Sequence, residues 1–136
     1  MANMTIEEVE GIGPAYGEKL RQASIQSTDA LLLAAATRKG RKDLAEQTGI
    51  SEKQVLKWAN MADLFRIRGV GPEFAELLEA AGVDTVKELR HRNAENLAAA
   101  MDEVNGERKL TRRVPNSQQV GGWIEEAKAL PAVLEY

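Results

Sequence analysis

The chain has 136 residues, of which 43% are apolar and 4% aromatic, and it carries 18 lysines and arginines against 21 aspartates and glutamates. This length limits the protein to one compact domain or two very small ones. The absence of cysteine excludes disulfides, thiolate zinc sites and cysteine nucleophiles, and the net charge of −3 lacks the basic balance typical of a nucleic-acid-binding domain. Any binding of nucleic acid must therefore be local.

The amino-terminal stretch has neither the basic segment nor the apolar core of a secretory leader. No apolar run approaches the roughly 20 residues that span a bilayer. We therefore expect a cytoplasmic protein that does not enter membranes.

Capping residues, glycine and proline predict two helices at the start of the chain. Thr5 and Glu8 have the spacing of a capping box, in which each side chain satisfies a free amide of the first turn, so a short helix should begin there. Gly11 and Gly13 then break this helix. A second helix is expected over 14–23, because proline is best tolerated at the first helical position.

Two more helices are predicted before the middle of the chain. A segment rich in leucine and alanine predicts a helix over Asp29–Ala36 with Thr28 as its cap. The basic segment Arg38–Lys42 that follows is interpreted as a loop between helices. Ser51 and Gln54 form a second capping box, which opens a helix whose apolar residues recur at helical spacing: Val55, Trp58, Ala59, Ala62 and Phe65.

The second half of the chain repeats the first. Residues 10–20 match residues 68–78 in a Gly-x-Gly-Pro motif, an aromatic residue, a small residue and a leucine, at an offset of 58. Trp58 pairs with Trp123 at an offset of 65, so the second copy contains an insertion of seven residues. No stretch alternates with the period of a strand, so the predicted fold is all-α. We expect two repeats packed as one compact unit, covering residues 1–64 and 65–136.

In each half, two apolar helices are joined by a glycine hairpin, Gly11-Ile12-Gly13 in the first and Gly69-Val70-Gly71 in the second. These segments resemble the helix-hairpin-helix family. The resemblance covers about residues 6–31 and 63–90. The tandem arrangement is similar to an uncharacterised bacterial family of duplicated helix-hairpin-helix proteins to which no activity has been assigned. It implies an internally duplicated helix-hairpin-helix bundle.

The turn of such a hairpin directs backbone amides outward, beside the positive end of the next helix, and so offers a small concavity for a phosphate oxygen. In the DNA-binding members of the family these amides contact phosphates and do not read bases. The resemblance therefore implies a primary candidate site at Gly69, Val70 and Gly71, and a secondary one at Gly11, Ile12 and Gly13. Ile12 and Val70 are expected in the core.

Acidic residues at both hairpins depart from the family pattern, in which basic residues follow the second glycine. Residues 7–10 contain three glutamates before the first hairpin, and Glu73 would face a phosphate at the second. Like charge at such a position weakens an anion site. The second hairpin is the better candidate, because Arg66 and Arg68 precede its glycines.

Thirteen of the 18 basic residues fall into three groups. Such groups could bracket a nucleic-acid backbone and release counterions on binding. They could equally be solvated segments near helix ends, where cations complement the helix dipole. The groups are Arg38, Lys39, Arg41 and Lys42; Arg108, Lys109, Arg112 and Arg113; and, around the second hairpin, Arg66, Arg68, Lys87, Arg90 and Arg92.

Two other modes of nucleic-acid recognition receive less support. Asp43–Trp58 has the spacing of a helix-turn-helix with Ser51 opening the recognition helix, but the second copy lacks the motif, and the helix offers only Lys53 and Lys57 as cations. Recognition of single strands by stacking is not expected, because both tryptophans lie on core faces of helices and only four other aromatic residues exist.

No motif indicates an enzyme. His91 is the sole histidine and lies between two arginines, and the chain has no phosphate-binding loop or dinucleotide motif. Asp102-Glu103 and Glu125-Glu126 are adjacent pairs on helices, so their side chains diverge and should not hold a metal ion. We expect a non-catalytic protein without cofactor, metal or small-molecule substrate.

The sequence therefore favours a binding module that contacts the backbone of DNA, or of RNA, weakly and without sequence specificity. The second hairpin and the basic groups would form its surface. The alternative is a protein–protein interaction or scaffold module that uses the acidic first hairpin and the helices rich in alanine and leucine. Basic groups that share one face with the second hairpin would favour the first function, and groups at opposite ends would favour the second.

Overall fold

The structure, a computed structural model of the chain, describes residues 4–9 and 11–136. Within these residues all regular secondary structure is helical, apart from one isolated bridge between Thr5 and Ser27. The predicted all-α fold is therefore confirmed for this part of the chain. In chain order the helices are the 3-10 turn η1 (Ile6–Glu8), α1 (Pro14–Gln22), α2 (Thr28–Ala34), α3 (Arg38–Thr48), α4 (Glu52–Leu64), α5 (Pro72–Ala80), α6 (Val86–Leu89), α7 (Ala94–Arg108) and α8 (Ser117–Ala129).

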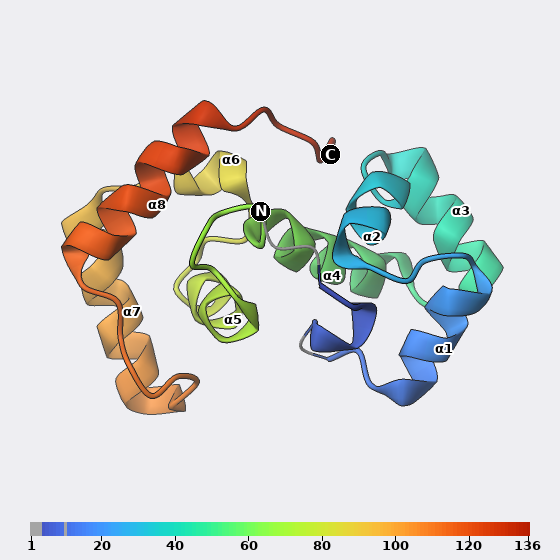
Figure 1. The fold of residues 1–136 in the computed structure, drawn as a ribbon, viewed down its shortest axis with the longest axis horizontal. Coiled ribbons are helices and arrows are strands. Elements are labelled where there is room, and N and C mark those ends of the chain that lie inside the picture. Colours follow the sequence, from blue (N-terminus) through green and yellow to red (C-terminus); the bar gives the residue numbers. More distant parts are fainter. Residues whose placement is uncertain (1–3, 10) are drawn as a thin grey trace.

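Helix α4 lies at the centre of the fold, with α1 to α3 on one side and α5 to α8 on the other (Figure 1). Every side chain from Trp58 to Leu64 is buried, because α2 and α3 of the first half and α5 of the second all pack against this helix. A helix buried on all faces belongs to the interior rather than to the surface. The buried apolar side chains of both halves form one core cluster.

Two predicted helix starts are confirmed by their caps. At η1 the Thr5 and Glu8 side chains form the capping box. At α4 the Ser51 hydroxyl accepts a hydrogen bond from the Gln54 amide at 3.2 Å. Both caps satisfy amides of a first turn that have no partner within the helix.

The start of α2 differs from the prediction by one residue. Ser27, and not Thr28, is its cap and accepts a hydrogen bond from the Ala30 amide at 3.2 Å. Thr28 is buried, and its hydroxyl accepts a hydrogen bond from the Met4 amide at 3.0 Å. A tertiary contact to the start of the chain therefore takes the hydroxyl that the sequence pattern assigns to the cap.

The interpretation of Arg38–Lys42 as a loop is wrong, because these residues form the first turns of α3. Thr37 caps the helix by accepting a hydrogen bond from the Gly40 amide at 3.0 Å. Gly40 suggests a loop in the sequence, but here it serves packing: a Cβ at this position would lie 2.3 Å from the Ala34 carbonyl oxygen at the end of α2. The glycine thus permits a close approach of α2 and α3.

A true turn joins α3 to α4 at the predicted helix-turn-helix spacing. Gly49 ends α3 with φ +77°, and Ser51 opens α4. Only the first turns of α4 reach the surface, however, because the helix is buried from Trp58 onward. Helix α4 therefore lacks the free face that a recognition helix needs to enter a major groove.

The two glycine turns have similar backbone geometry. Gly11 and Gly69 have φ of +92° and +87°, and the residues two positions later, Gly13 and Gly71, cap α1 and α5 with nearly equal dihedral angles. Trp58 of α4 and Trp123 of α8 are 0% and 4% exposed, so both occupy the buried positions that the sequence predicts.

The second half is longer in two places. Helix α3 has 11 residues, whereas α7 has 15. Only residues 49–51 separate α3 from α4, whereas residues 109–116 separate α7 from α8. Together these two segments are nine residues longer than their counterparts, and α7 begins at an offset of 56 from α3, two less than 58, so the net difference is seven residues.

Residues 130–136 form a tail that leaves α8 and returns to the first half, where it ends beside α2 and α3 (Figure 1). The Glu135 amide donates to the Ala36 carbonyl at 2.7 Å. This tail is a second connection between the two halves, in addition to α4.

Candidate nucleic-acid interface

The second hairpin lies between the end of α4 and the start of α5. Gly69 has φ +87°, a left-handed conformation that glycine adopts without steric cost. The turn brings the Val70 amide to the Ile67 carbonyl at 3.1 Å and buries the Val70 side chain, as expected. Gly71 caps α5 in an extended conformation and offers no side chain to the first-turn amides of that helix.

A tryptophan lies beneath each hairpin. A Cβ on Gly69 would lie 3.3 Å from Trp123 Nε1, and a Cβ on Gly11 would lie 3.2 Å from Trp58 Nε1. The Trp123 ring also contacts Phe74 of α5, with ring centroids 5.3 Å apart. The first glycine of each hairpin is therefore required by close packing as well as by its backbone conformation.

The outer side of the second hairpin is hollowed by two adjoining grooves. One has a volume of about 580 Å³ and is lined by Gly69, Gly71, Pro72, Glu73 and Phe74. The other has a volume of about 290 Å³ and is lined by Glu73, Phe74, Thr111, Arg112 and Arg113. The loop after α7 thus brings two exposed arginines beside the start of α5, although they are distant from the hairpin in sequence.

A single asparagine orders this loop. Asn105 Nδ2 donates to the Thr111 carbonyl at 3.0 Å, and Asn105 Oδ1 accepts from the Thr111 amide at 2.9 Å. The Thr111 hydroxyl then donates to the Arg113 carbonyl at 2.6 Å. No motif in the sequence marks Asn105, because its partner belongs to an irregular loop. It positions the arginines without facing the groove itself.

Carboxylates reduce the positive charge of the second hairpin. The Arg68 amide donates to both oxygens of Glu126 from α8, at 3.2 and 3.3 Å. Glu73 is exposed at the first turn of α5. The Glu126 carboxylate illustrates that this turn attracts anions, but it also occupies one amide that a phosphate would use.

The first hairpin has the same backbone with different surroundings. Tyr16 packs on Trp58 with ring centroids 5.1 Å apart and is 43% exposed, and Lys19 Nζ lies 5.7 Å from the Tyr16 ring. Ile12 is buried, as predicted. Glu7 pairs with Arg21 across the hairpin. Glu10 lies outside the described residues.

The first basic group lies away from the second hairpin. Arg38, Lys39 and Lys42 are exposed on the first turns of α3, on the opposite side of the fold from α7 (Figure 1). The group at residues 108–113 instead lies at the end of α7 and in the loop after it. Cations oppose the dipole at the start of α3 and complement it at the end of α7. The two groups therefore do not share one face, which counts against a nucleic-acid surface built from both of them. Only Arg112 and Arg113 of the group at residues 108–113 lie beside the second hairpin.

Four arginines predicted as phosphate contacts hold partners within the protein. Arg41 and Arg66 are buried, and Arg41 donates to main-chain carbonyls while Arg66 pairs with Asp63 at 2.8 Å. Arg90 donates to a carbonyl of the tail at 2.7 Å, and Arg92 lies 3.8 Å from a carboxylate four residues before it. The candidate surface therefore does not include these four arginines.

The four basic residues of the group at 108–113 do not form a single cluster at the end of α7. Arg108 lines a groove of about 280 Å³ between the halves, together with Gly11, Lys57 and residues of α5. Lys109 ends α7 in a left-handed conformation with φ +51°. Arg112 and Arg113 alone of this group line the grooves at the second hairpin.

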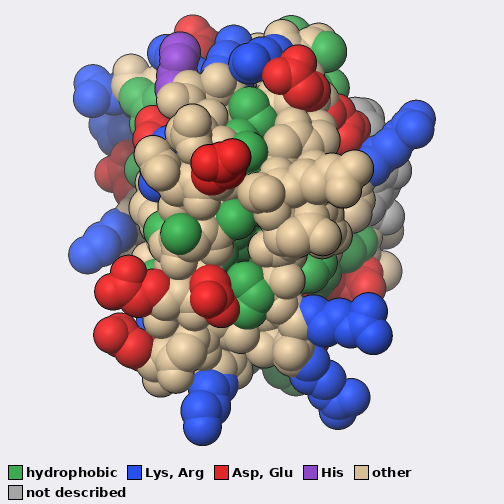
Figure 2. Space-filling view, turned by 90° about the vertical axis from the view of Figure 1, so that its left-hand side faces the viewer, with side chains coloured by type: hydrophobic (Ala, Val, Ile, Leu, Met, Phe, Trp, Pro, Cys, Tyr) green, Lys and Arg blue, Asp and Glu red, His purple; other side chains and the backbone are tan. Residues whose placement is uncertain are grey.

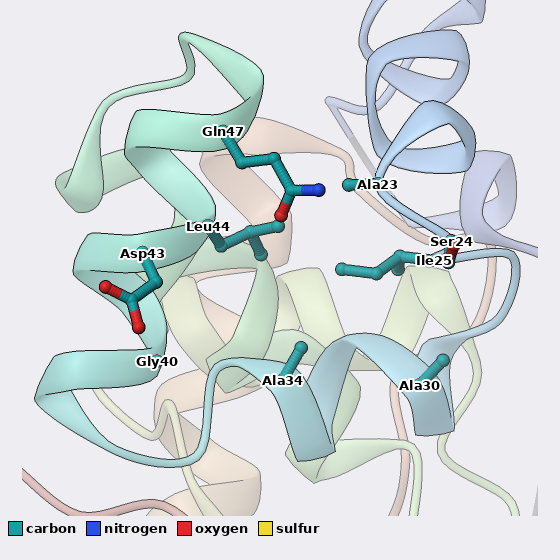
Figure 3. A pocket seen from close by; sticks show the side chains of 9 residues that line it. All are labelled: Ala23, Ser24, Ile25, Ala30, Ala34, Gly40, Asp43, Leu44 and Gln47. Carbon is teal, nitrogen blue, oxygen red and sulfur yellow. The ribbon is translucent and has the colours of Figure 1, made fainter.

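Two other surfaces carry less of the required charge. Basic side chains lie around the margins of the face formed by α7 and α8, and acidic side chains lie both among them and toward the centre of the face (Figure 2). A pocket of about 340 Å³ between α2 and α3 is lined mainly by small and apolar residues, with Ile25 and Leu44 pointing toward one another across it (Figure 3). Asp43 is the one charged residue lining that pocket.

Residues 4–9 and 11–136 contain neither a cluster of metal-ligating side chains nor a membrane-spanning helix. In that part of the chain, no three histidine, aspartate or glutamate side chains come together in a way that could hold a metal ion. No helix there has the length and apolar character needed to cross a membrane.

Comparison with known proteins places the chain in a family. No curated protein and no solved structure matches it. One family matches residues 10–130, which include both hairpins, all helices from α1 to α8 and the ordered loop after α7. The chain belongs to this family, which is described as Domain of unknown function (DUF4332).

Proposed function

We propose that the chain is an internally duplicated helix-hairpin-helix protein of the cytoplasm that binds the phosphate backbone of duplex DNA weakly, without reading bases. The binding surface, here called the hairpin–loop surface, consists of Arg68, Gly69, Gly71, the first turn of α5, Arg112 and Arg113. The observation that carries the proposal is the groove in which Arg112 and Arg113 lie beside the start of α5.

The backbone of the surface suits an anion. Gly71 leaves the first-turn amides of α5 without a side-chain cap, and the positive end of the helix dipole points the same way. Two exposed arginines border this helix end, and they supply charge that the hairpin itself lacks. A phosphate could therefore contact amides and guanidinium groups together.

The charge balance of the surface predicts weak binding. Arg68, Arg112 and Arg113 supply three positive charges, whereas Glu73 and Glu126 supply two negative ones. Contacts to two or three phosphates would give a slope of log K against log salt of about −2 to −3. A dissociation constant of about 10⁻⁴ to 10⁻⁶ M near physiological salt is expected for such contacts.

The test is the anisotropy of a labelled duplex at several salt concentrations, with two double variants that remove equal charge. Arg112→Ala with Arg113→Ala should flatten the slope by about 2. Arg38→Ala with Lys39→Ala, on α3, should leave the slope unchanged because that group lies away from the hairpin. Equal effects of the two double variants would refute the proposed surface. No binding by the wild-type chain at low salt would refute DNA binding and leave the protein-interaction function.

A further inference from the structure

Three arginines from different parts of the fold donate to the backbone of the tail, residues 130–136. Arg90 Nη2 donates to the Leu130 carbonyl at 2.7 Å, and Arg66 Nη2 donates to the Pro131 carbonyl at 2.6 Å. Arg41 Nη2 donates to the carbonyl of Glu135 at 2.7 Å. Arg41 belongs to α3, Arg66 follows α4 and Arg90 follows α6, so the tail is held by both halves.

Side chains of the tail add contacts at its far end. Leu134 is buried, and the Tyr136 hydroxyl donates to Asn60 Oδ1 of α4 at 2.8 Å. The Arg41 guanidinium lies 5.8 Å from the centre of the Tyr136 ring. The rest of the fold thus contacts the tail through three of its main-chain carbonyls, one buried apolar side chain, and the ring and hydroxyl of Tyr136.

Of the three arginines, Arg41 depends most on the tail for hydrogen-bond partners. It is only 5% exposed, and among the described residues no carboxylate lies within ion-pair distance of it. Its partners are the carbonyls of Ala35, at 2.9 Å, of Ala36, at 3.4 Å, and of Glu135 in the tail. A buried guanidinium is costly unless its donors are satisfied, so the Glu135 carbonyl satisfies Arg41 Nη2 while the tail is docked, and water replaces that carbonyl when the tail departs.

Arg66 differs from Arg41 because it has an ionic partner. Asp63 Oδ1 accepts from Arg66 at 2.8 Å, and Asp63 Oδ2 accepts from the Val86 amide at the same distance. This pair remains satisfied when the tail departs, and only the hydrogen bond from Arg66 to the Pro131 carbonyl is lost. The dependence on the tail is therefore strongest at Arg41, where the tail meets the first half.

We propose that Arg41, Arg66 and Arg90 line a binding site for an extended peptide backbone, which in this chain holds residues 130–136 as an intramolecular ligand that latches the second half onto the first. This inference is independent of DNA binding. Because Pro131, Ala132 and Glu135 are exposed and Leu134 is the one buried side chain of the tail, the latch opens reversibly without unfolding the core. A short tether gives the attached tail an effective concentration of about millimolar, so free peptide competes at that level.

The chain has no cysteine, so one introduced thiol reports on the latch in the full-length protein. Leu134→Cys places the thiol at the buried position, and Ala132→Cys, exposed in the same tail, is the matched control. We expect the Leu134→Cys thiol to react with a labelling reagent more slowly than the control. Adding Arg41→Met should raise its rate about tenfold through the lost charged hydrogen bond, whereas Arg38→Met, exposed on the same helix, should not.

Competition provides a readout that does not depend on the folding of the arginine variants. A synthetic peptide of residues 130–136 at millimolar concentration should accelerate labelling of the Leu134→Cys protein, and a scrambled peptide should not. Equal labelling of the two cysteine variants, equal effects of Arg41→Met and Arg38→Met, or no response to the peptide would each overturn the proposal.

Discussion

Alanine substitutions at Gly69 and Gly71 distinguish the glycine that the turn requires from the glycine that, under the proposed function, would lie against a phosphate. Gly69 has φ +87°, and a Cβ there would lie 3.3 Å from Trp123 Nε1. Gly71 has φ −97° and ψ −171°, and a Cβ there would meet nothing within 4 Å. The left-handed conformation costs an L-residue about 1 to 2 kcal/mol, and Trp123 is too deeply packed to move away freely.

We therefore expect Gly69→Ala to lower the free energy of unfolding by about 1 to 2 kcal/mol, and Gly71→Ala to change it by less than about 0.5 kcal/mol. For a chain of this length, each kcal/mol corresponds to a fall in Tm of about 3 to 5 °C. Thermal unfolding followed by circular dichroism measures the difference. Gly11→Ala and Gly13→Ala repeat the comparison at the first hairpin, where φ is +92° at Gly11 and a Cβ on Gly13 also meets nothing.

Equal losses of stability for Gly69→Ala and Gly71→Ala would refute this assignment. A harmless Gly69→Ala would show that the turn relaxes, and that neither the backbone conformation nor the indole beneath it constrains the hairpin.

Further predictions concern stability, binding and pH. Trp58→Ala should lower the free energy of unfolding by about 3 to 5 kcal/mol in urea titrations, because the ring is completely buried. Asp63→Ala should cost a similar amount, about 3 to 5 kcal/mol, because it leaves Arg66 as a buried charge without its ion pair. Gly71→Val should fold normally yet weaken DNA binding in the anisotropy assay, since the added side chain blocks approach to the amides of α5. Burial and, to a smaller extent, the negative charges of Asp84 and Asp63 raise the pKa of Tyr136 from 10.0 to about 12, against an opposing effect of Arg41. The tail contact of the neutral phenol therefore stabilises the fold fully below about pH 10 and is lost as pH rises through about 12, so the stability difference between wild type and Tyr136→Phe should shrink over that range.

The two glycine turns and the helices that follow them could be predicted because their signals are local. Glycine at the left-handed position, proline at the first helical position and a repeated tryptophan all lie within or at fixed spacing from the motif, and each constrains the backbone directly. The same reasoning fails at Gly40, because the reason for that glycine is the carbonyl of Ala34 on another helix. A packing glycine and a loop glycine look the same in sequence.

The roles of the arginines could not be predicted, because their partners are distant in sequence. Arg41 donates to the Glu135 carbonyl across 94 residues, and Arg66 donates to the Pro131 carbonyl across 65. A cation near a glycine hairpin suggests a phosphate contact, and nothing in its neighbours marks it as a partner of the tail. Asn105 illustrates the converse, since an ordinary helical asparagine orders the loop that presents Arg112 and Arg113.

The most direct test of the hairpin–loop surface is an amide chemical-shift titration of the isotopically labelled chain with a short DNA duplex at low salt. We expect shifts at Gly69, Gly71, the first turn of α5 and residues 109–113, with the first hairpin and α3 unchanged. Shifts centred on α3 or on Gly11 and Gly13, or no shifts at all, would contradict it.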